Sequence, residues 1–464
     1  MNFTKKSINE LINTVFHCTC GKDHCANIQN IAIGKDAIKK MPPMIDCQVL
    51  KNGKVFDKTK DLITVVSDVN TEAAAGKAVK ALLEDLGYRI ESYVLPHKEM
   101  HAEEKYAKEI DANLSEETKL LIAVGSGSLN DMARYVAFAR KMPYYIVATA
   151  PSMDGYASNV SPLVHNNLKI TYPAECAAAI IGDTGFLATA PAYMIAAGLG
   201  DILCKYLCIN DWKMSSIINQ EYFCPEVADL VLFSVEKCIS NIKGLQNRED
   251  DALQYLMESL VLIGIAMSYI GYSRPASSSE HHIAHLLEMK SIFAGEYGEL
   301  HGTNVGVATC ILEGMVKDLL TMDFDYDMAR EKARRFNLEE WEKEIHHCYG
   351  IGAEEVIKLY HTARQNEPEE VVARINAIEA NEKELRSMLE SVLEQLKPCP
   401  EMLKSLDGLT DFSTYSFSKE ELIEILTYAK DVRSRYGLLQ IFYDLGVLET
   451  LCTNAVATTP SRES

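Results

Sequence analysis

Apolar and polar positions follow two different periods along the 464-residue chain. Up to about residue 190, short runs rich in β-branched residues alternate with segments whose apolar residues recur every three or four positions. The first pattern predicts buried strands and the second predicts amphipathic helices. Strands are expected at residues 28–34, 62–66, 88–95, 120–124, 144–149 and 179–183, with a hairpin over 160–172. Helices are expected at 35–41, 72–86, 103–112 and 129–141, and a short amphipathic one at 1–11.

From about Pro191 the period is helical to the end of the chain. Helices are expected at residues 226–243, 250–271, 279–291, 303–320, 328–335, 339–347, 353–361, 367–397 and 419–436. The alternation of strands and helices up to about residue 190 predicts a doubly wound parallel sheet. We therefore expect a Rossmann-like α/β domain over residues 1–188, followed by an all-helical domain over 189–464. The strongly charged stretch 367–397 is typical of a solvated or interface helix.

Composition narrows the class of partner. The formal net charge is −20, with 66 acidic against 46 basic residues, which disfavours nucleic acid or an anionic membrane. The longest apolar run, residues 260–271, is too short to cross a bilayer and predicts a buried helix. The thirteen cysteines follow no disulfide framework, and no signal segment opens the chain. A reduced, cytoplasmic protein without membrane insertion is expected.

A glycine-containing loop follows the predicted strand 120–124. It reads Gly125-Ser126-Gly127-Ser128 and precedes a helix, whose free N–H groups could hold a phosphate. This sequence is neither GxGxxG nor a Walker loop, so a tight strand-to-helix turn is an equal alternative. Asp68 ends an earlier strand, where a carboxylate can take ribose hydroxyls. Its other interpretation is the N-cap of the next helix.

Two further acidic residues stand in informative settings. Asp154 lies in a loop of small and polar residues directly after strand 144–149, at the edge where ligands bind parallel sheets. Asp201 interrupts a largely apolar helix and needs a metal or a charged partner, for which Lys205 one turn on is a candidate.

Histidines gather near the middle of the helical half. His281 and His285 are four residues apart and share a helix face, while His282 points elsewhere. With His301 they could grip a divalent metal. The alternative is a set of polar or capping histidines on an amphipathic helix.

Near the N-terminus, Cys18, Cys20, His24 and Cys25 fall within eight residues. Three thiols and an imidazole could hold zinc, but the ligands are crowded and no second CxxC follows. A reduced, partly exposed loop is the default interpretation.

Several motifs together resemble one superfamily. In chain order they are GSGSLND, TAPSMDGYAS, AGLGDILCKY, SRPASSSEHHIAH and LHGTNVG. Over residues 16–450 the sequence resembles the iron-containing alcohol dehydrogenases and dehydroquinate synthases, and most of all the bacterial glycerol-1-phosphate dehydrogenase branch. The TAPSMDG segment, Asp211-Trp212 and the SRPAS…EHH run favour that branch, and the cysteine-rich start is similar to it as well. The resemblance implies a dehydroquinate synthase-like fold and weakens the case for a separate zinc site.

The resemblance also implies site residues. It assigns one divalent metal, Zn, Ni or Fe, to Asp201, His281 and His301, with His285 lining the site and no role for His282. It implies NAD(H) or NADP(H) as cofactor, and Asp68 leans toward NAD. The cofactor-binding residues it implies are Asp68, Gly125, Ser126, Gly127, Ser128, Asp131, Thr149, Ser152 and Ser158. Serine at 126 departs from the three consecutive glycines of many relatives.

The implied activity is reversible reduction of dihydroxyacetone phosphate to sn-glycerol 1-phosphate, in a cleft between the domains of a homo-oligomer. Asp154 and His285 are the candidate proton-handling residues, and Asp154 also lies beside the substrate. Candidate cations for the phosphate of this small triose are Lys205, Arg274 and Lys169.

Three alternatives stay open. A glycerol or polyol dehydrogenase would keep the metal and cofactor sites but lack a phosphate pocket. A dehydroquinate-synthase-like cyclase would use NAD catalytically, although its acidic ligand is usually Glu where this chain has Asp201. A redox-sensing dinucleotide-binding protein would not need the metal ligands.

Overall fold

The computed structural model describes residues 2–165 and 168–459. The chain folds into two compact units, each of which is assembled from two segments. Unit 1 comprises Met1–Ile202 and Asp229–Tyr272, and unit 2 comprises Leu203–Ala228 and Ser273–Ser464. The boundary expected at residues 188/189 stays a prediction.

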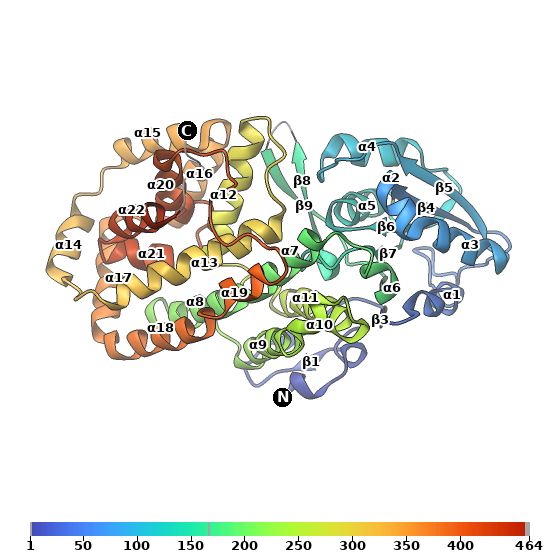
Figure 1. Cartoon of the computed structure of the whole chain (residues 1–464), viewed down its shortest axis with the longest axis horizontal. Helices are drawn as coiled ribbons and strands as arrows, with labels where there is room; N and C mark the ends of the chain where they lie inside the picture. Colours follow the sequence, from blue (N-terminus) through green and yellow to red (C-terminus); the bar gives the residue numbers. More distant parts are fainter. Residues whose placement is uncertain (1, 166–167, 460–464) are drawn as a thin grey trace. The chain divides into compact units, whose positions relative to one another are not determined.

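Unit 1 is built around a six-stranded sheet in which every pair of neighbours is parallel. The spatial order is β3-β10-β7-β6-β4-β5 (Figure 1). The strands are β3 (Asn30–Gly34), β4 (Leu62–Asp68), β5 (Arg89–Leu95), β6 (Thr118–Gly125), β7 (Tyr144–Ala148) and β10 (Ala179–Asp183). All six expected strands and the parallel sheet are confirmed.

Two antiparallel hairpins accompany this sheet. They are β1 (Phe16–His17) with β2 (Asp23–His24), and β8 (Val160–His165) with β9 (Leu168–Pro173). The second is the hairpin expected over residues 160–172, of which 166–167 lie outside the described residues.

Helices cover the sheet on both faces, as a doubly wound topology requires. A buried cluster joins α1, α3 and strands β4 and β6 on one face, through residues such as Ile45, Val79, Val65 and Ile122. The steps from β4 to β5 and from β6 to β7 run in opposite directions along the sheet, so right-handed crossovers place α5 on the other face.

The helical segments of unit 1 are mostly short. They are η1 (Phe3–Lys5), η2 (Ile8–Glu10), η3 (Ala37–Lys40), α1 (Met41–Asp46), α2 (Val69–Thr71), η4 (Glu72–Gly76), α3 (Lys77–Asp85), α4 (Glu104–Ala112), α5 (Gly127–Ala139), η5 (Gly155–Ala157), α6 (Thr184–Leu187), α7 (Ala192–Leu203), α9 (Pro225–Ile239), α10 (Ile242–Gln246) and α11 (Asp250–Ile270). Helices α7 and α9 run across the unit boundaries.

The direction in which successive strands are added to the sheet reverses between β4 and β6. Val66 of β4 pairs with Ala123 of β6, so Asp68 and Gly125 each follow two residues later at the same edge. This is the topological switch point, where open parallel sheets bind their ligands outside the carboxyl ends of the strands. The fold therefore brings two loops singled out in the sequence to one edge.

Every regular element among the described residues of unit 2 is a helix. Its helices are α8 (Lys205–Ile218), α12 (Ser279–Phe293), α13 (His301–Leu320), α14 (Tyr326–Arg334), α15 (Leu338–Tyr349), η6 (Gly350–Gly352), α16 (Ala353–Ala363), α17 (Pro368–Ala380), α18 (Glu382–Leu396), α19 (Cys399–Lys404), α20 (Lys419–Tyr428), η7 (Ala429–Asp431), α21 (Leu438–Asp444) and α22 (Leu448–Thr458). The expected α/β-then-helical organisation is confirmed.

Three local expectations are wrong. The amphipathic helix at 1–11 is instead η1 and η2, because the Ser7 hydroxyl and Glu10 form a capping box that starts a new turn there. The helix at 367–397 breaks at Asn381, whose side-chain amide donates to the Ala377 carbonyl. The helix at 419–436 ends at Tyr428 and continues only as η7.

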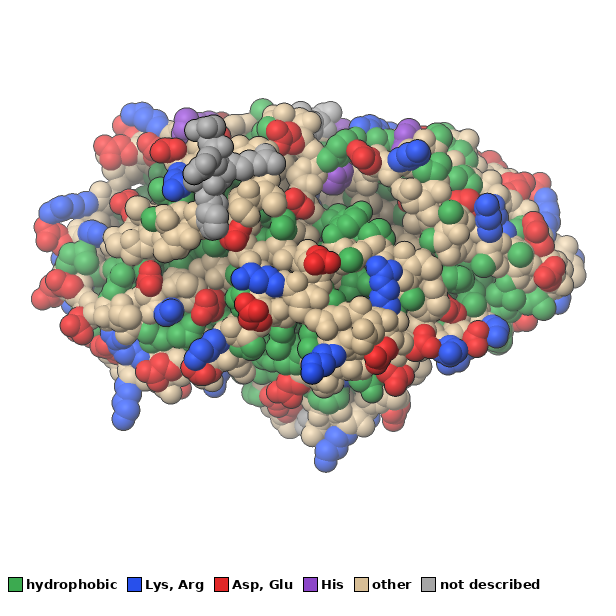
Figure 2. All heavy atoms as spheres, in the orientation of Figure 1, with side chains coloured by type: hydrophobic (Ala, Val, Ile, Leu, Met, Phe, Trp, Pro, Cys, Tyr) green, Lys and Arg blue, Asp and Glu red, His purple; other side chains and the backbone are tan. Residues whose placement is uncertain are grey.

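Two helical stretches, Ala192–Ile218 and Asp250–Ile270, are long and apolar enough to cross a membrane by length and composition alone. In their most apolar windows, 83% and 72% of the residues are buried in the protein. Core helices meet the same criterion, so this is weak evidence for a membrane span. The buried helix expected at 260–271 is confirmed as the second half of α11. On the face seen in Figure 2, acidic and basic side chains are interspersed.

Candidate active site

The loop between β6 and α5 depends on its two glycines. A Cβ on Gly125 would lie 2.6 Å from the Leu129 side chain, and one on Gly127 would lie 2.9 Å from Met153. Both contacts are closer than real Cβ atoms show, so larger residues require neighbours to shift. Ser126 is the N-cap residue, and α5 begins at Gly127 with its first N–H groups directed back toward the loop. This geometry suits a phosphate at the start of α5.

Asp68 is the N-cap of the helical segment after β4, which is one of its two interpretations from the sequence. Its Oδ1 accepts from the N–H groups of Asn70 at 2.8 Å and Thr71 at 2.9 Å, and so caps the helical segment after β4. The carboxylate nonetheless lies at the switch-point edge, two residues beyond the β4–β6 pairing. Capping and a ribose contact are compatible because a carboxylate has several lone pairs.

The loop after β7 is pressed against α7. A Cβ on Gly198 would lie 1.8 Å from the carbonyl oxygen of Pro151, so helix and loop backbones approach as closely as glycine allows. One turn further along α7, the Asp201 Oδ2 accepts from the Asp154 N–H at 2.9 Å. Asp154 and Asp201 are 8% and 0% exposed. The two acidic residues that the sequence placed 47 positions apart therefore belong to one buried cluster.

Asp131 is held by an arginine. The fully buried Arg134 donates to its Oδ1 at 2.7 Å, and also to the carbonyls of Gly155 and Val160. Arg134 also donates to the Tyr144 hydroxyl, whose pKa burial raises to about 12. Asp131 thus helps to anchor α5 to the loop after β7, next to the proposed cofactor edge.

The polar residues of this edge have distinct surroundings. Thr149 donates its N–H to the Gly125 carbonyl at 3.1 Å, which ties the loop after β7 to the loop after β6. Ser158 exchanges hydrogen bonds with the backbone of Val160 through its hydroxyl. Ser152 is buried, whereas Ser126 and Ser128 are half-buried.

In unit 2, three of the four histidines carried by α12 and α13 form an array. The ring centroids of His281 and His301 are 5.2 Å apart, those of His285 and His301 are 5.4 Å apart, and those of His281 and His285 are 5.9 Å apart. Burial lowers the pKa of His281 well below its usual value, helped by the positive charge of Lys205. A neutral imidazole is the form that binds a metal.

Two glutamates that sequence reasoning missed orient these rings. Glu288 accepts from the Nδ1 of His301 at 2.6 Å and contacts the Nδ1 of His285 at 3.5 Å. Glu280 contacts the Nδ1 of His281 at 2.9 Å. A carboxylate on Nδ1 fixes the tautomer that presents Nε2 as a ligand atom. The signal was available in part, since Glu288 follows His281 and His285 by seven and three residues on one helix face.

The fourth histidine lies apart from the array's hydrogen bonds. His282 is 2% exposed, and its Nε2 has no hydrogen-bond partner among the described residues. Burial lowers its pKa well below the usual value. A neutral ring packed in the helical core agrees with the structural interpretation of this position.

Residues that suggested a particular branch of the superfamily support the start of α12. The Asp211 carboxylate accepts from the hydroxyls of Ser278 and Ser279 at 2.7 Å each, and from the Leu438 N–H at 3.2 Å. Trp212 is fully buried and donates to the Tyr222 carbonyl. These contacts fix the first turn of the helix that carries the histidines.

The candidate cations differ in how they are engaged. Arg274 is fully buried and forms a bidentate pair with Glu221, at 3.0 and 2.9 Å. Lys205 is also fully buried, and its Nζ donates to the Ala276 carbonyl at 2.9 Å. Its charge lowers the pKa of His281, so it acts on the histidine array. Lys169 lies on β9, paired in register with Val164.

Comparisons with known proteins identify relatives of this chain. The family model described as iron-containing alcohol dehydrogenase matches residues 33–191. The chain is 31% identical to a glycerol-1-phosphate dehydrogenase (NAD(P)+) of Halalkalibacterium halodurans over 305 residues, which cover 65% of this chain and 74% of that protein. It is 27% identical to a Bacillus licheniformis protein of the same name over 452 residues, 96% of this chain and 97% of that one.

Solved structures support the fold. A sulfoacetaldehyde reductase of Bifidobacterium kashiwanohense, solved in complex with NAD+, superimposes with a TM-score of 0.57 at 12% identity. The alignment covers 94% of this chain and 99% of that chain.

Proposed function

Because the chain belongs to the glycerol-1-phosphate dehydrogenases of the iron-containing alcohol dehydrogenase superfamily and is an oxidoreductase, we propose that it reduces dihydroxyacetone phosphate to sn-glycerol 1-phosphate with NADH or NADPH, reversibly. The observation that carries the proposal is the array of His281, His285 and His301, whose Nδ1 atoms face glutamate carboxyls. Such an arrangement leaves ring nitrogens in the ligand form.

The residues present fit a divalent metal. His281 and His301 supply imidazoles, and we assign the buried Asp201 as the carboxylate ligand. Two imidazoles and one carboxylate suit Zn, Ni or Fe, and three protein ligands leave room for substrate oxygens. When bound, the ion would polarise the carbonyl that accepts hydride. The chain's own contribution is to hold the imidazoles neutral and oriented.

The cofactor is assigned to the switch-point edge of unit 1. The backbone of residues 125–128 and the start of α5 would hold the pyrophosphate, and Asp68 the adenosine ribose. Thr149, Ser152 and Ser158 would lie along the nicotinamide half, with Asp131 anchoring α5. Support comes from the two glycines that a Cβ would obstruct and from the β4–β6 reversal.

Proton delivery is assigned to His285, with Asp154 beside the substrate. In its imidazolium form, His285 would give its Nε2 proton to the product oxygen and become neutral, while it keeps the Nδ1 proton that faces Glu288. For the substrate phosphate we favour Lys205, because its charge already acts on the histidine array. Arg274 is less suited, since Glu221 occupies its guanidinium.

A substrate panel tests the proposal. NADH oxidation is measured with dihydroxyacetone phosphate, dihydroxyacetone and a heptulosonate phosphate, each with Zn, Ni or Fe supplied. We expect turnover of the triose phosphate to exceed that of dihydroxyacetone by at least about 100-fold in kcat/KM, because unsatisfied phosphate-binding groups penalise the smaller ligand. Equal turnover would indicate a polyol dehydrogenase, phosphate release a cyclase, and no turnover a binding protein.

We also propose that the enzyme is cytoplasmic and homo-oligomeric, as the sequence analysis anticipates. Sedimentation of the purified protein tests the second point. A monomer at micromolar concentration would contradict it.

A further inference from the structure

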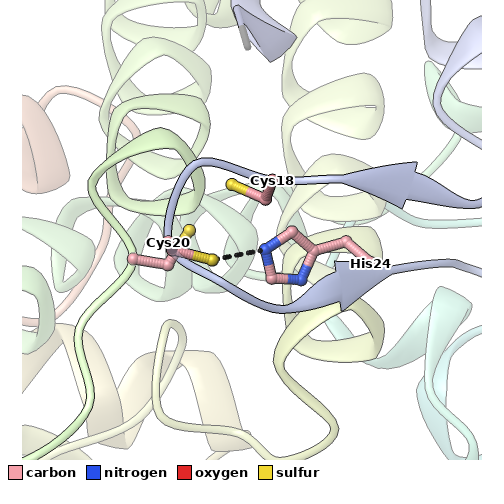
Figure 3. Close-up of side chains that lie close together, drawn as sticks. Cys18, Cys20 and His24 are labelled. Atoms are coloured by element: carbon pink, nitrogen blue, oxygen red, sulfur yellow. Dashed lines mark hydrogen bonds between the residues drawn. The ribbon is translucent and has the colours of Figure 1, made fainter.

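A second cluster of metal-binding side chains lies far from the histidine array in the sequence. The turn between β1 and β2 brings the thiols of Cys18 and Cys20 and the imidazole of His24 together, and Figure 3 shows the three side chains converging. Their ligand atoms all lie within 4.8 Å of one another. The Cys20 sulfur is 3.3 Å from the His24 Nε2. Two ligands of one tetrahedral zinc stand about 3.5–3.8 Å apart, so small side-chain adjustments suffice.

The backbone of this turn is set to hold the two thiols. The Gly21 N–H donates to the Cys18 carbonyl at 3.1 Å, and the Cys18 N–H donates to the Lys22 carbonyl at 3.1 Å. Gly21 has φ +85°, a conformation that other residues rarely adopt. These two hydrogen bonds therefore hold a turn that presents Cys18 and Cys20 toward the second strand.

The tautomer of the His24 ring is set by a contact of its other nitrogen. Its Nδ1 lies 2.8 Å from the carbonyl oxygen of Tyr269. A carbonyl only accepts, so Nδ1 carries a proton, and in the metal-binding neutral form the lone pair is therefore on Nε2. That lone pair is directed at the Cys20 sulfur. A zinc-bound histidine characteristically donates its second N–H to such a carbonyl, which holds the ring in place.

The imidazole is also held by packing. His24 is 1% exposed, and its ring stacks on Tyr269 with centroids 5.5 Å apart and an interplanar angle of 18°. Phe3 approaches the same ring edge-on. The Tyr269 carbonyl belongs to the last turn of α11, where the helix itself offers no N–H partner. The hairpin is thereby tied to a core helix of the same unit.

The neighbouring thiol is directed elsewhere. The Cys25 Sγ donates to the Asn27 side-chain oxygen at 3.4 Å and is absent from the converging group. Of the four candidate ligands in the sequence, the structure therefore selects three. Cys25 provides a matched control, because it is the adjacent residue to His24 and carries the same chemical group as the two selected thiols.

We propose that Cys18 Sγ, Cys20 Sγ and His24 Nε2 bind one zinc ion that is separate from the metal of the proposed reaction. The fourth position is filled by water or by another side chain. Binding displaces the two thiol protons and leaves the His24 Nδ1–H in place. The ion is structural: it clamps the N-terminal hairpin, and through His24 the end of α11.

Metal content of the full-length protein tests this inference. Zinc is measured by mass spectrometry in the parent protein and in Cys18→Ser, Cys20→Ser, His24→Gln and Cys25→Ser, each made in the wild-type and in the His281→Ala background. We expect each of the first three variants to lose about one equivalent of zinc per chain in both backgrounds. Cys25→Ser should keep it. Full retention in Cys20→Ser, or equal loss in Cys25→Ser, would overturn the proposal.

Cobalt gives a second readout that does not depend on the reaction. Protein stripped with a chelator and refilled with Co²⁺ should show a near-ultraviolet thiolate-to-cobalt charge-transfer band. That band should vanish in Cys20→Ser and persist in both Cys25→Ser and His281→Ala. A band that is absent from the parent protein, or lost in His281→Ala alone, would contradict thiolate coordination at the hairpin. Failure of the substrate panel would leave both measurements unaffected.

Discussion

The proposed cofactor edge of unit 1 and the histidine array of unit 2 are built in opposite ways. The edge rests on backbone: glycines at 125, 127 and 198 permit approaches that a Cβ would block, and N–H groups face outward. The array rests on side chains: three imidazoles are set by two carboxyls on helices of ordinary geometry. We therefore expect substitutions at the edge to act through steric clashes. Substitutions in the array should act through the loss of metal binding or of ring orientation.

The largest effect is expected at the array. His281→Ala should remove bound metal and lower kcat by about 1000-fold or more, because a Lewis acid supplies several kcal/mol of transition-state stabilisation. Metal content and NADH turnover are measured together, and cofactor affinity by fluorescence titration should change little. His282→Asn is the control in the same helix turn and should keep the metal. Full activity in His281→Ala would refute the assignment.

At the edge, a steric clash alone should lower the stability of the protein. Gly198→Ala places a Cβ 1.8 Å from the Pro151 oxygen, so we expect the free energy of unfolding to fall by about 3 kcal/mol. Denaturant titration measures this. Gly314→Ala is the matched control on α13, since nothing lies within 4 Å of its Cβ position, and alanine there should raise stability by up to about 1 kcal/mol. Equal stability changes in the two variants would contradict the close approach.

A milder change separates orientation from ligation. Glu288→Gln keeps the shape but removes the charge that faces the Nδ1 atoms of His285 and His301. Loss of such an outer carboxylate costs about 10- to 100-fold in metal affinity or activity. Competition with a metal chelator measures the affinity. An unchanged affinity together with unchanged kcat would show that the carboxylate is dispensable.

The smallest effect is expected at Asp68, whose side chain caps backbone N–H groups and whose charge is proposed to act on the cofactor ribose. Asp68→Asn keeps an N-cap acceptor for the Asn70 and Thr71 N–H groups, so stability should hold. Losing the negative charge should shift kcat/KM toward NADPH relative to NADH by about fivefold, the scale of one half-exposed charge contact. An unchanged cofactor ratio would place the ribose elsewhere.

Regular strands and helices were predictable because burial imposes its period on the sequence. Short apolar runs indicated the strands of the parallel sheet, and the spacing of His281 and His285 placed these two rings on one helix face, whereas the ligand set came from the resemblance. The break at Asn381 was not predictable, since asparagine occurs inside many helices and only its bond to Ala377 ends this one.

Contacts between side chains on different helices were the part of the site that was harder to predict from the sequence. Glu280 and Glu288 are ordinary helix residues in sequence, and only the packing of α12 with α13 turns Glu288 toward His301. Arg274 had the right charge for a phosphate, but Glu221, 53 positions away, pairs with it. Likewise the sequence could not choose among Cys18, Cys20 and Cys25, because only the folded hairpin brings the first two thiols to His24 and leaves the third beside Asn27.

Glu288 touches two rings to which we assign different tasks, through a separate oxygen for each. A substitution of Glu288 is therefore expected to affect both histidines. The effects of substitutions at His285 and His301 should accordingly depend on each other. A substitution of the proposed proton donor at 285 should also perturb the proposed ligand at 301, unless position 288 changes with it. Directed evolution toward new substrates should accordingly find paired changes at 285 and 288 more often than single ones.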